Sequence, residues 1–203
     1  MRTRSFIGFL LLLAGCALVD HPTVLPNGEM PSSASTRADV VSPISNAETR
    51  VTKKPFRISI SPTTSPVQPE RFSGYHTGTD FETFLNEQDT DVEIFSICSG
   101  KVRFTGWVKG YGGVLIQDCT YENEPVTVLY GHLSIDSVSL RSGVDLSTGG
   151  RIGNLGKGFS TETDGERKHL HLSIHRGMTI EYRGYVQTEE ELSDWTNPFP
   201  QIP

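Results

Sequence analysis

Two short polar motifs in this chain carry the residue types that bind zinc in hydrolases. His76 and Asp80 lie four residues apart, and His169 and His171 form a second pair much later in the sequence. A catalytic zinc is held by about three protein groups drawn from His, Asp and Glu, and water takes the remaining position. Two motifs that converge on one ion would therefore supply the donors of a metal that activates water.

The second motif fits a β-strand. Successive side chains of a strand point to opposite faces, so His169 and His171 would share one face. Leu170, Leu172 and Ile174 alternate with these polar positions and are expected to face the core. Both imidazoles should then point into a cleft on the other face.

The first motif has helical spacing but is not expected to form a helix. Gly74 and Gly78 disfavour one, so we expect an extended segment or a tight loop between His76 and Asp80. An isolated pair of this kind is usually just exposed polar positions on the surface. A further histidine, His132, adds a residue type suited to proton transfer or metal binding.

The order of motifs from Phe72 to Pro198 resembles the lysostaphin/LytM-type zinc metallopeptidases, which cut peptide bonds in bacterial peptidoglycan. The matching segments are residues 76–81, 99–102, 110–116, 128–134, 151–153 and 169–171. Several ordered matches over more than half of the chain make a specific resemblance.

The resemblance implies a role for each residue of the site. His76, Asp80 and His171 would bind one Zn²⁺ per domain, and His132 and His169 would be catalytic without binding the metal. Two neutral imidazoles and one carboxylate leave a zinc ion with net positive charge, which suits the polarisation of a substrate carbonyl. Which of the two catalytic histidines acts as the general base stays open.

The fold class follows from short β-rich segments that glycine turns separate. They lie at residues 92–97, 102–107, 114–117 and 126–130, and no long amphipathic helix stands out. We expect an all-β domain, mainly an antiparallel sheet, with short helices at most. The resemblance narrows this to a lysostaphin/LytM-like open β-sandwich with a catalytic groove.

Residues 1–16 have the layout of a lipoprotein signal peptide. Arg2 and Arg4 precede an apolar run at residues 6–13, and the ending at Cys16 resembles a bacterial lipobox. Acylation of Cys16 would anchor the protein in a lipid bilayer. The alternative is a plain signal peptide with an incidental cysteine. Because Ala17 follows, the expected location in a host with two membranes is the outer membrane, facing the periplasm.

The next segment, residues 17–54, has the composition of a flexible tether. It is rich in Pro, Ser, Thr and Asn and shows little periodic apolar pattern, so it could not offset the entropy of ordering by burial. Residues 55–203 would then form the single metallopeptidase domain, which is long enough for a hydrophobic core.

Two features near the expected site have two interpretations each. Cys98 and Cys119 flank predicted hairpin strands and would form a disulfide after export, or else remain as two buried free thiols. Residues 158–168 are longer and more charged than the glycine-rich turn that the family places there. They form either an altered wall of the cleft or a tolerated surface insertion, and the insertion is the favoured interpretation. His175 is expected on the surface, and His21 in the tether.

Two functions from different classes remain. The first is a zinc-dependent endopeptidase acting on peptidoglycan stem peptides or cross-links, and retention of all five site residues favours it. The second is a non-catalytic lipoprotein of the same fold that binds the cell wall or activates another hydrolase. The net charge of −6 and the lack of a basic cluster exclude nucleic acid as a partner. Nothing in the sequence identifies a regulatory protein.

Overall fold

The computed structural model describes residues 41–50 and 53–198. Their regular structure consists of β-strands and short 3₁₀-helices, and they contain no α-helix. The strands are β1 (Ser59–Ile60), β2 (Gly74–His76), β3 (Gly78–Glu82), β4 (Glu93–Phe95), β5 (Gly100–Val108), β6 (Gly112–Tyr121), β7 (Glu124–Ser134), β8 (Asp145–Leu146), β9 (Arg151–Leu155), β10 (His169–Arg176), β11 (Tyr185–Val186) and β12 (Trp195–Thr196). The helices are η1 (Ala47–Thr49), η2 (Leu85–Glu87), η3 (Ile135–Ser137), η4 (Thr161–Thr163) and η5 (Glu191–Asp194). The all-β prediction is confirmed.

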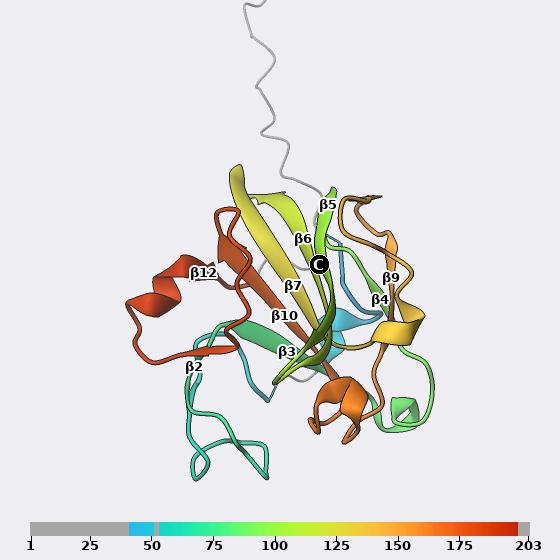
Figure 1. Ribbon diagram of the computed structural model, residues 1–203. Helices are drawn as coiled ribbons and strands as arrows, with labels where there is room; N and C mark the ends of the chain where they lie inside the picture. Colours follow the sequence, from blue (N-terminus) through green and yellow to red (C-terminus); the bar gives the residue numbers. More distant parts are fainter. Residues whose placement is uncertain (1–40, 51–52, 199–203) are drawn as a thin grey trace, which may run out of the picture. The chain divides into compact units, whose positions relative to one another are not determined.

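Most strands belong to one large antiparallel sheet. Its main path runs β12-β10-β7-β6-β5-β8, while β3 pairs with β10, and β9 joins β7 to β4. Figure 1 shows β3, β10, β7 and β6 lying side by side. The β6–β7 hairpin closes on Glu122 and Asn123, whose φ angles of 51° and 67° match the hairpin turns that follow the twist of the strands. Strand β10 pairs with β7 along one edge and with β3 and β12 along the other.

The core lies against one face of this sheet. Leu170, Leu172 and Ile174 of β10 are fully buried, so the alternation predicted from the sequence is confirmed. They share one cluster with Phe81 of β3 and Tyr130 of β7. Each such side chain contributes roughly 1.5–3 kcal/mol when buried. The side chains on the other face of the same strands point away from this core and can form a functional site.

Part of the predicted tether is packed on the domain. Ile44 bridges Ile94 of β4 and is fully buried, as is Ala47. The Arg50 guanidinium binds the Glu87 carboxylate with its two terminal nitrogens at 2.7 and 2.9 Å. The boundary at residue 54 is therefore too late, because a few apolar side chains between polar ones are enough to order this segment. Residues 1–16 and 17–40 lie outside the described residues, and the signal peptide and the tether there stay predictions.

A second, three-stranded sheet has the order β1-β2-β11. Ser59 and Ile60 pair with Tyr75 and Gly74, and Tyr185 of β11 pairs with His76. A small cluster of Val186, Leu192 and Trp195 packs beneath it. This sheet fixes β2, the strand that ends in His76.

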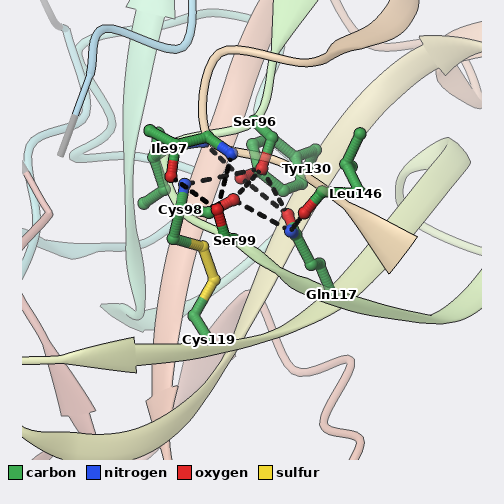
Figure 2. The surroundings of a disulfide bond; sticks show 9 residues. Ser96, Ile97, Cys98, Ser99, Gln117, Cys119, Tyr130 and Leu146 are labelled. Carbon is green, nitrogen blue, oxygen red and sulfur yellow. Dashed lines mark hydrogen bonds between the residues drawn. A yellow bond between two sulfur atoms is a disulfide. The ribbon is translucent and has the colours of Figure 1, made fainter. Parts of the chain in front are cut away.

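A disulfide joins Cys98 and Cys119, the pair that the sequence singled out (Figure 2). It connects the segment before β5 to β6. Beside it, Gln117 accepts a hydrogen bond from the Ser96 hydroxyl at 2.6 Å and donates to the carbonyls of Cys98 and Leu146 at 3.0 and 3.1 Å. The buried amide and the disulfide thus hold the same loop against the sheet.

None of the helices among the described residues has the length and hydrophobicity that a membrane-spanning helix requires.

Removal of the disulfide should destabilise the domain without unfolding it. The bridge spans 21 residues of sequence, and closing a loop of this size contributes about 3 kcal/mol by restricting the unfolded chain. We expect the double variant Cys98→Ala/Cys119→Ala to lose about that much free energy of unfolding in urea titrations. Wild-type protein unfolded in reductant serves as the control and should approach the variant. Equal stability of the variant and the oxidised wild type would contradict this prediction.

Candidate functional site

Three donor atoms converge where β2, β3 and β10 meet. The Nε2 atom of His76 lies 3.1 Å from Nδ1 of His171 and 3.4 Å from Oδ1 of Asp80, and the last two atoms are 3.1 Å apart. Tetrahedral zinc with bonds of about 2.0–2.1 Å requires ligand atoms about 3.3 Å apart. The triangle therefore fits a metal of this size, and these are the residues that the resemblance implied as ligands.

The register of β3 against β10 brings two of these donors together. Asp80 lies directly opposite His171, and Glu82 lies opposite His169. Directly opposed side chains of an antiparallel pair lie on the same face of the sheet. His76 reaches the same point from the smaller sheet, as an extended residue just before β3, and the expected extended conformation of this motif is confirmed.

Neighbouring groups orient each donor. The Nδ1 atom of His76 lies 3.3 Å from the Pro55 carbonyl, which favours a proton on Nδ1 and a free lone pair on Nε2. Nε2 of His171 lies 3.3 Å from the Tyr111 hydroxyl, which leaves Nδ1 for the metal position. Histidines that bind metals usually have such a partner on the other ring nitrogen.

Burial and charge set the protonation of the donors. Burial alone would raise the pKa of Asp80, but its electrostatic interactions with His169 and His76, with hydrogen bonds from His169 and His171, hold that pKa well below its usual range. Burial lowers the pKa of His171 to about 4. At neutral pH the site thus offers an ionised carboxylate and a neutral imidazole, the forms that bind metals.

A bulge in β7 directs His132 into the site. Gly131 pairs with both His171 and Val114, but Leu133 pairs with Gly113, so His132 is the extra residue of the strand. Its φ of 63° is left-handed. In a regular strand the residue after Gly131 would face the core, and the bulge turns the imidazole to the metal side instead.

The two histidines outside the donor triangle are adjacent. The rings of His132 and His169 lie 4.3 Å apart between centroids. Nδ1 of His169 is 2.9 Å from the Arg167 carbonyl, and its Nε2 is 3.2 Å from Oδ2 of Asp80. Burial lowers the pKa of His132 well below its ordinary value, and its Nδ1 has no hydrogen-bond partner among the described residues. The structure thus brings all five predicted site residues together.

Aromatic residues that the sequence analysis missed line the adjoining cleft. Its volume is about 270 Å³, and its walls include Phe72, Tyr111, Tyr182 and Tyr185. Phe72 stacks on Tyr185, whose ring lies 5.1 Å from that of His76. Gly131 makes room for Tyr111, because a β-carbon there would meet its ring at 2.6 Å. Gly131, directly before His132, was the sequence signal for the packing of Tyr111.

The charged segment at residues 158–168 is part of the cleft rather than a surface insertion. The Trp107 indole donates to the Thr161 carbonyl at 2.9 Å, and the Asp164 carboxylate accepts from the Gly110 backbone at 2.7 Å. Glu166 lines the cleft beside the metal position. The favoured interpretation as a surface insertion is therefore wrong, and the altered wall agrees with the structure.

The histidine that was expected on the surface, His175, is not part of the donor triangle. His175 is half-buried rather than exposed, and its ring packs edge-on against Trp195 at 4.9 Å. Cys16, the proposed lipid attachment site, falls outside the described residues.

Gly78 is a position where one methyl group should disturb the site. A β-carbon there would lie 2.5 Å from the Leu172 carbonyl and 2.7 Å from Nε2 of His171. We expect Gly78→Ala to displace His171 and weaken zinc binding at least tenfold in calorimetric titrations, the scale typical of a disturbed ligand shell. The control is Gly177→Ala, which has a φ of +77° and open space around it. It should lose about 1–2 kcal/mol of stability and keep its zinc affinity. Equal zinc affinity in the two variants would contradict the prediction.

The sequence profile of Peptidase family M23 matches residues 74–182, more than half of the chain. The matched span includes all five residues of the site. No curated protein sequence matches the chain.

Solved structures share the fold at low identity. A chain of the SpoIIQ–SpoIIIAH pore-forming complex is 16% identical with a TM-score of 0.53, and the match covers 82% of this chain and 92% of that one. The catalytic domain of lysostaphin from Staphylococcus simulans is 19% identical with a TM-score of 0.49, covering 76% and 92%. Helicobacter pylori Csd3 is 24% identical with a TM-score of 0.49, covering 81% of this chain and 33% of that protein.

The chain spans 33%, 35% and 44% of the lengths of the first solved structures that it matches. The five residues of its site nevertheless lie within the span that the family profile matches. On that profile match, the chain belongs to peptidase family M23, whose lysostaphin/LytM-type members its motifs resemble.

Proposed function

We propose that the protein is a zinc-dependent endopeptidase that hydrolyses peptide bonds in bacterial peptidoglycan. The observation that supports this most is the arrangement of His76, Asp80 and His171 as a zinc-sized triangle at an open cleft. Two further histidines, His132 and His169, stand beside it without being needed as ligands. Both line the same cleft as the donors, and Nδ1 of His132 has no hydrogen-bond partner among the described residues.

Each residue has a distinct part in this proposal. His76, Asp80 and His171 would hold the metal, which when bound supplies a Lewis acid for the scissile carbonyl and lowers the pKa of water. The Arg167 carbonyl keeps a proton on Nδ1 of His169, so Nε2 is the atom that can exchange a proton. Burial keeps His132 neutral, and a neutral imidazole can accept a proton or donate a hydrogen bond to developing charge. Together the pair can move the proton that an amine leaving group needs.

The lining of the cleft supports a peptide substrate with charges of both signs. Lys109 and Glu166 lie at its rim, and the aromatic side chains of Tyr111, Tyr182 and Tyr185 form its walls. Peptidoglycan stem peptides carry both carboxylates and amines. Aromatic walls offer large apolar area for the aliphatic parts of such a peptide.

The proposal predicts that zinc binding and cleavage can be separated by mutation. With purified peptidoglycan, the wild type should release peptide fragments that mass spectrometry identifies. His171→Ala should lose both bound zinc and cleavage. His132→Gln should keep zinc, because His132 is outside the donor triangle, and should lose cleavage about 10²–10⁴-fold, the usual effect of removing a proton-transfer group.

The control is His175→Gln, a histidine on the same strand as His171 but packed against Trp195, which should retain cleavage. If the wild type binds peptidoglycan but shows no zinc-dependent cleavage, the proposal fails. The non-catalytic role in binding the wall or activating another hydrolase would then be favoured.

We also propose that Cys16 is acylated and anchors the protein at the cell envelope, on the periplasmic side of the outer membrane where the host has two membranes. This part rests on the sequence of residues 1–17 alone. Labelling cells with an alkyne-tagged fatty acid should mark the wild type in the membrane fraction. Cys16→Ser should lose the label, whereas Cys98→Ala/Cys119→Ala should keep it. Label that persists in Cys16→Ser would overturn the anchor.

A further inference from the structure

Arg167 is a buried arginine next to the metal position, and it is neither a donor of the triangle nor one of the two histidines beside it. It lies two residues before His169, the first residue of β10. Its exposed fraction is only 9%. Buried arginines are uncommon unless they are paired, so its contacts should explain its position.

The guanidinium of Arg167 joins two carboxylates of β3. Its Nη2 donates to Oδ2 of Asp80 at 3.0 Å and to Oε1 of Glu82 at 2.6 Å, and its Nε donates to Oε2 of Glu82 at 3.1 Å. Glu82 is two residues from Asp80 and faces the same side of the sheet. The positive charge next to the metal position is thereby offset by a carboxylate that is not itself in the donor triangle.

The two oxygens of the Asp80 carboxylate therefore have different partners. Oδ1 lies 3.1 Å from Nδ1 of His171 and faces the donor triangle, while Oδ2 accepts a hydrogen bond from Arg167 at 3.0 Å and lies 3.2 Å from Nε2 of His169. A carboxylate held by one oxygen has little freedom to rotate and presents the other in a fixed direction. Arginine suits this task because its planar fork can bind two acceptors at once, which the single ammonium of lysine does less well.

The backbone of the same residue orients a second group. The Arg167 carbonyl lies 2.9 Å from Nδ1 of His169, which faces the site with Nε2. One residue therefore contacts both a donor of the triangle and one of the two histidines beside it.

We propose that Arg167 is a positioning residue of the metal site, which fixes Asp80 so that Oδ1 alone is offered to the metal. This inference rests on the proposed function, since it requires that the triangle binds zinc. The competing explanation is a purely structural ion pair between Arg167 and Glu82 that fastens residues 158–168 to β3.

Zinc affinity separates the two explanations. The dissociation constant of the full chain for Zn²⁺ would be measured by competition with a chromophoric chelator, and the Co²⁺-loaded protein would report coordination through its visible absorption. We expect Arg167→Met to bind zinc about 10–100-fold more weakly and to show an altered cobalt spectrum. Arg167→Lys should fall between Arg167→Met and the wild type. The matched control is Arg151→Met, which removes an exposed arginine at the start of β9 that pairs with Glu93 of β4, and it should leave both readouts unchanged.

The outcomes are distinguishable. A folded Arg167→Met with wild-type zinc affinity, or with tighter binding, overturns the inference and supports the structural ion pair. If Arg167→Met does not fold, Arg167→Lys decides, and wild-type affinity and cobalt spectrum in that variant overturn the inference equally. A wild type that binds no zinc overturns the proposed function and this inference with it, whereas a wild type that binds zinc and unaffected Arg167 variants overturn this inference alone.

Discussion

The pairing of β3 with β10 is the constraint on which the rest of the site depends. Its register sets Asp80 opposite His171 and Glu82 opposite His169, and so puts four polar side chains on one face while Leu170 and Leu172 fill the other. A slip by one residue would exchange the two faces. The hydrophobic core and the metal triangle are therefore specified by the same alternation, and neither can be changed without the other.

Much of this arrangement was predictable from the sequence because it follows from local periodicity. The strand through His169 and His171, its buried leucines and the all-β class all follow from a repeat of two residues. The roles of His76, Asp80 and His132 could not be derived that way, because they depend on contacts between distant segments. The resemblance of the motifs implied those roles, and the structure shows that the three side chains lie close together.

What the sequence did not predict came from departures from regular structure. The bulge at His132 turns its side chain to the face opposite the one it would have in a regular strand. No local sequence pattern predicts such a bulge. Arg167 was counted among the charges of an insertion, yet it is buried between Asp80 and Glu82. Ile44 and Ala47 belong to a stretch whose composition predicts a flexible linker. Both side chains are nevertheless buried in the core, so this part of the stretch is ordered.

Under the proposed acylation of Cys16, the burial of Ile44 would shorten the distance over which the domain could act. If residues 17–54 were all free chain, they could place the domain up to about 130 Å from the acylated residue, at roughly 3.4 Å per residue when fully extended. With residues 43–50 packed on the domain, a tether over residues 17–42 would span at most about 90 Å. The radius within which the proposed enzyme could reach peptidoglycan would thus depend on where the first of the described core residues occurs in the chain.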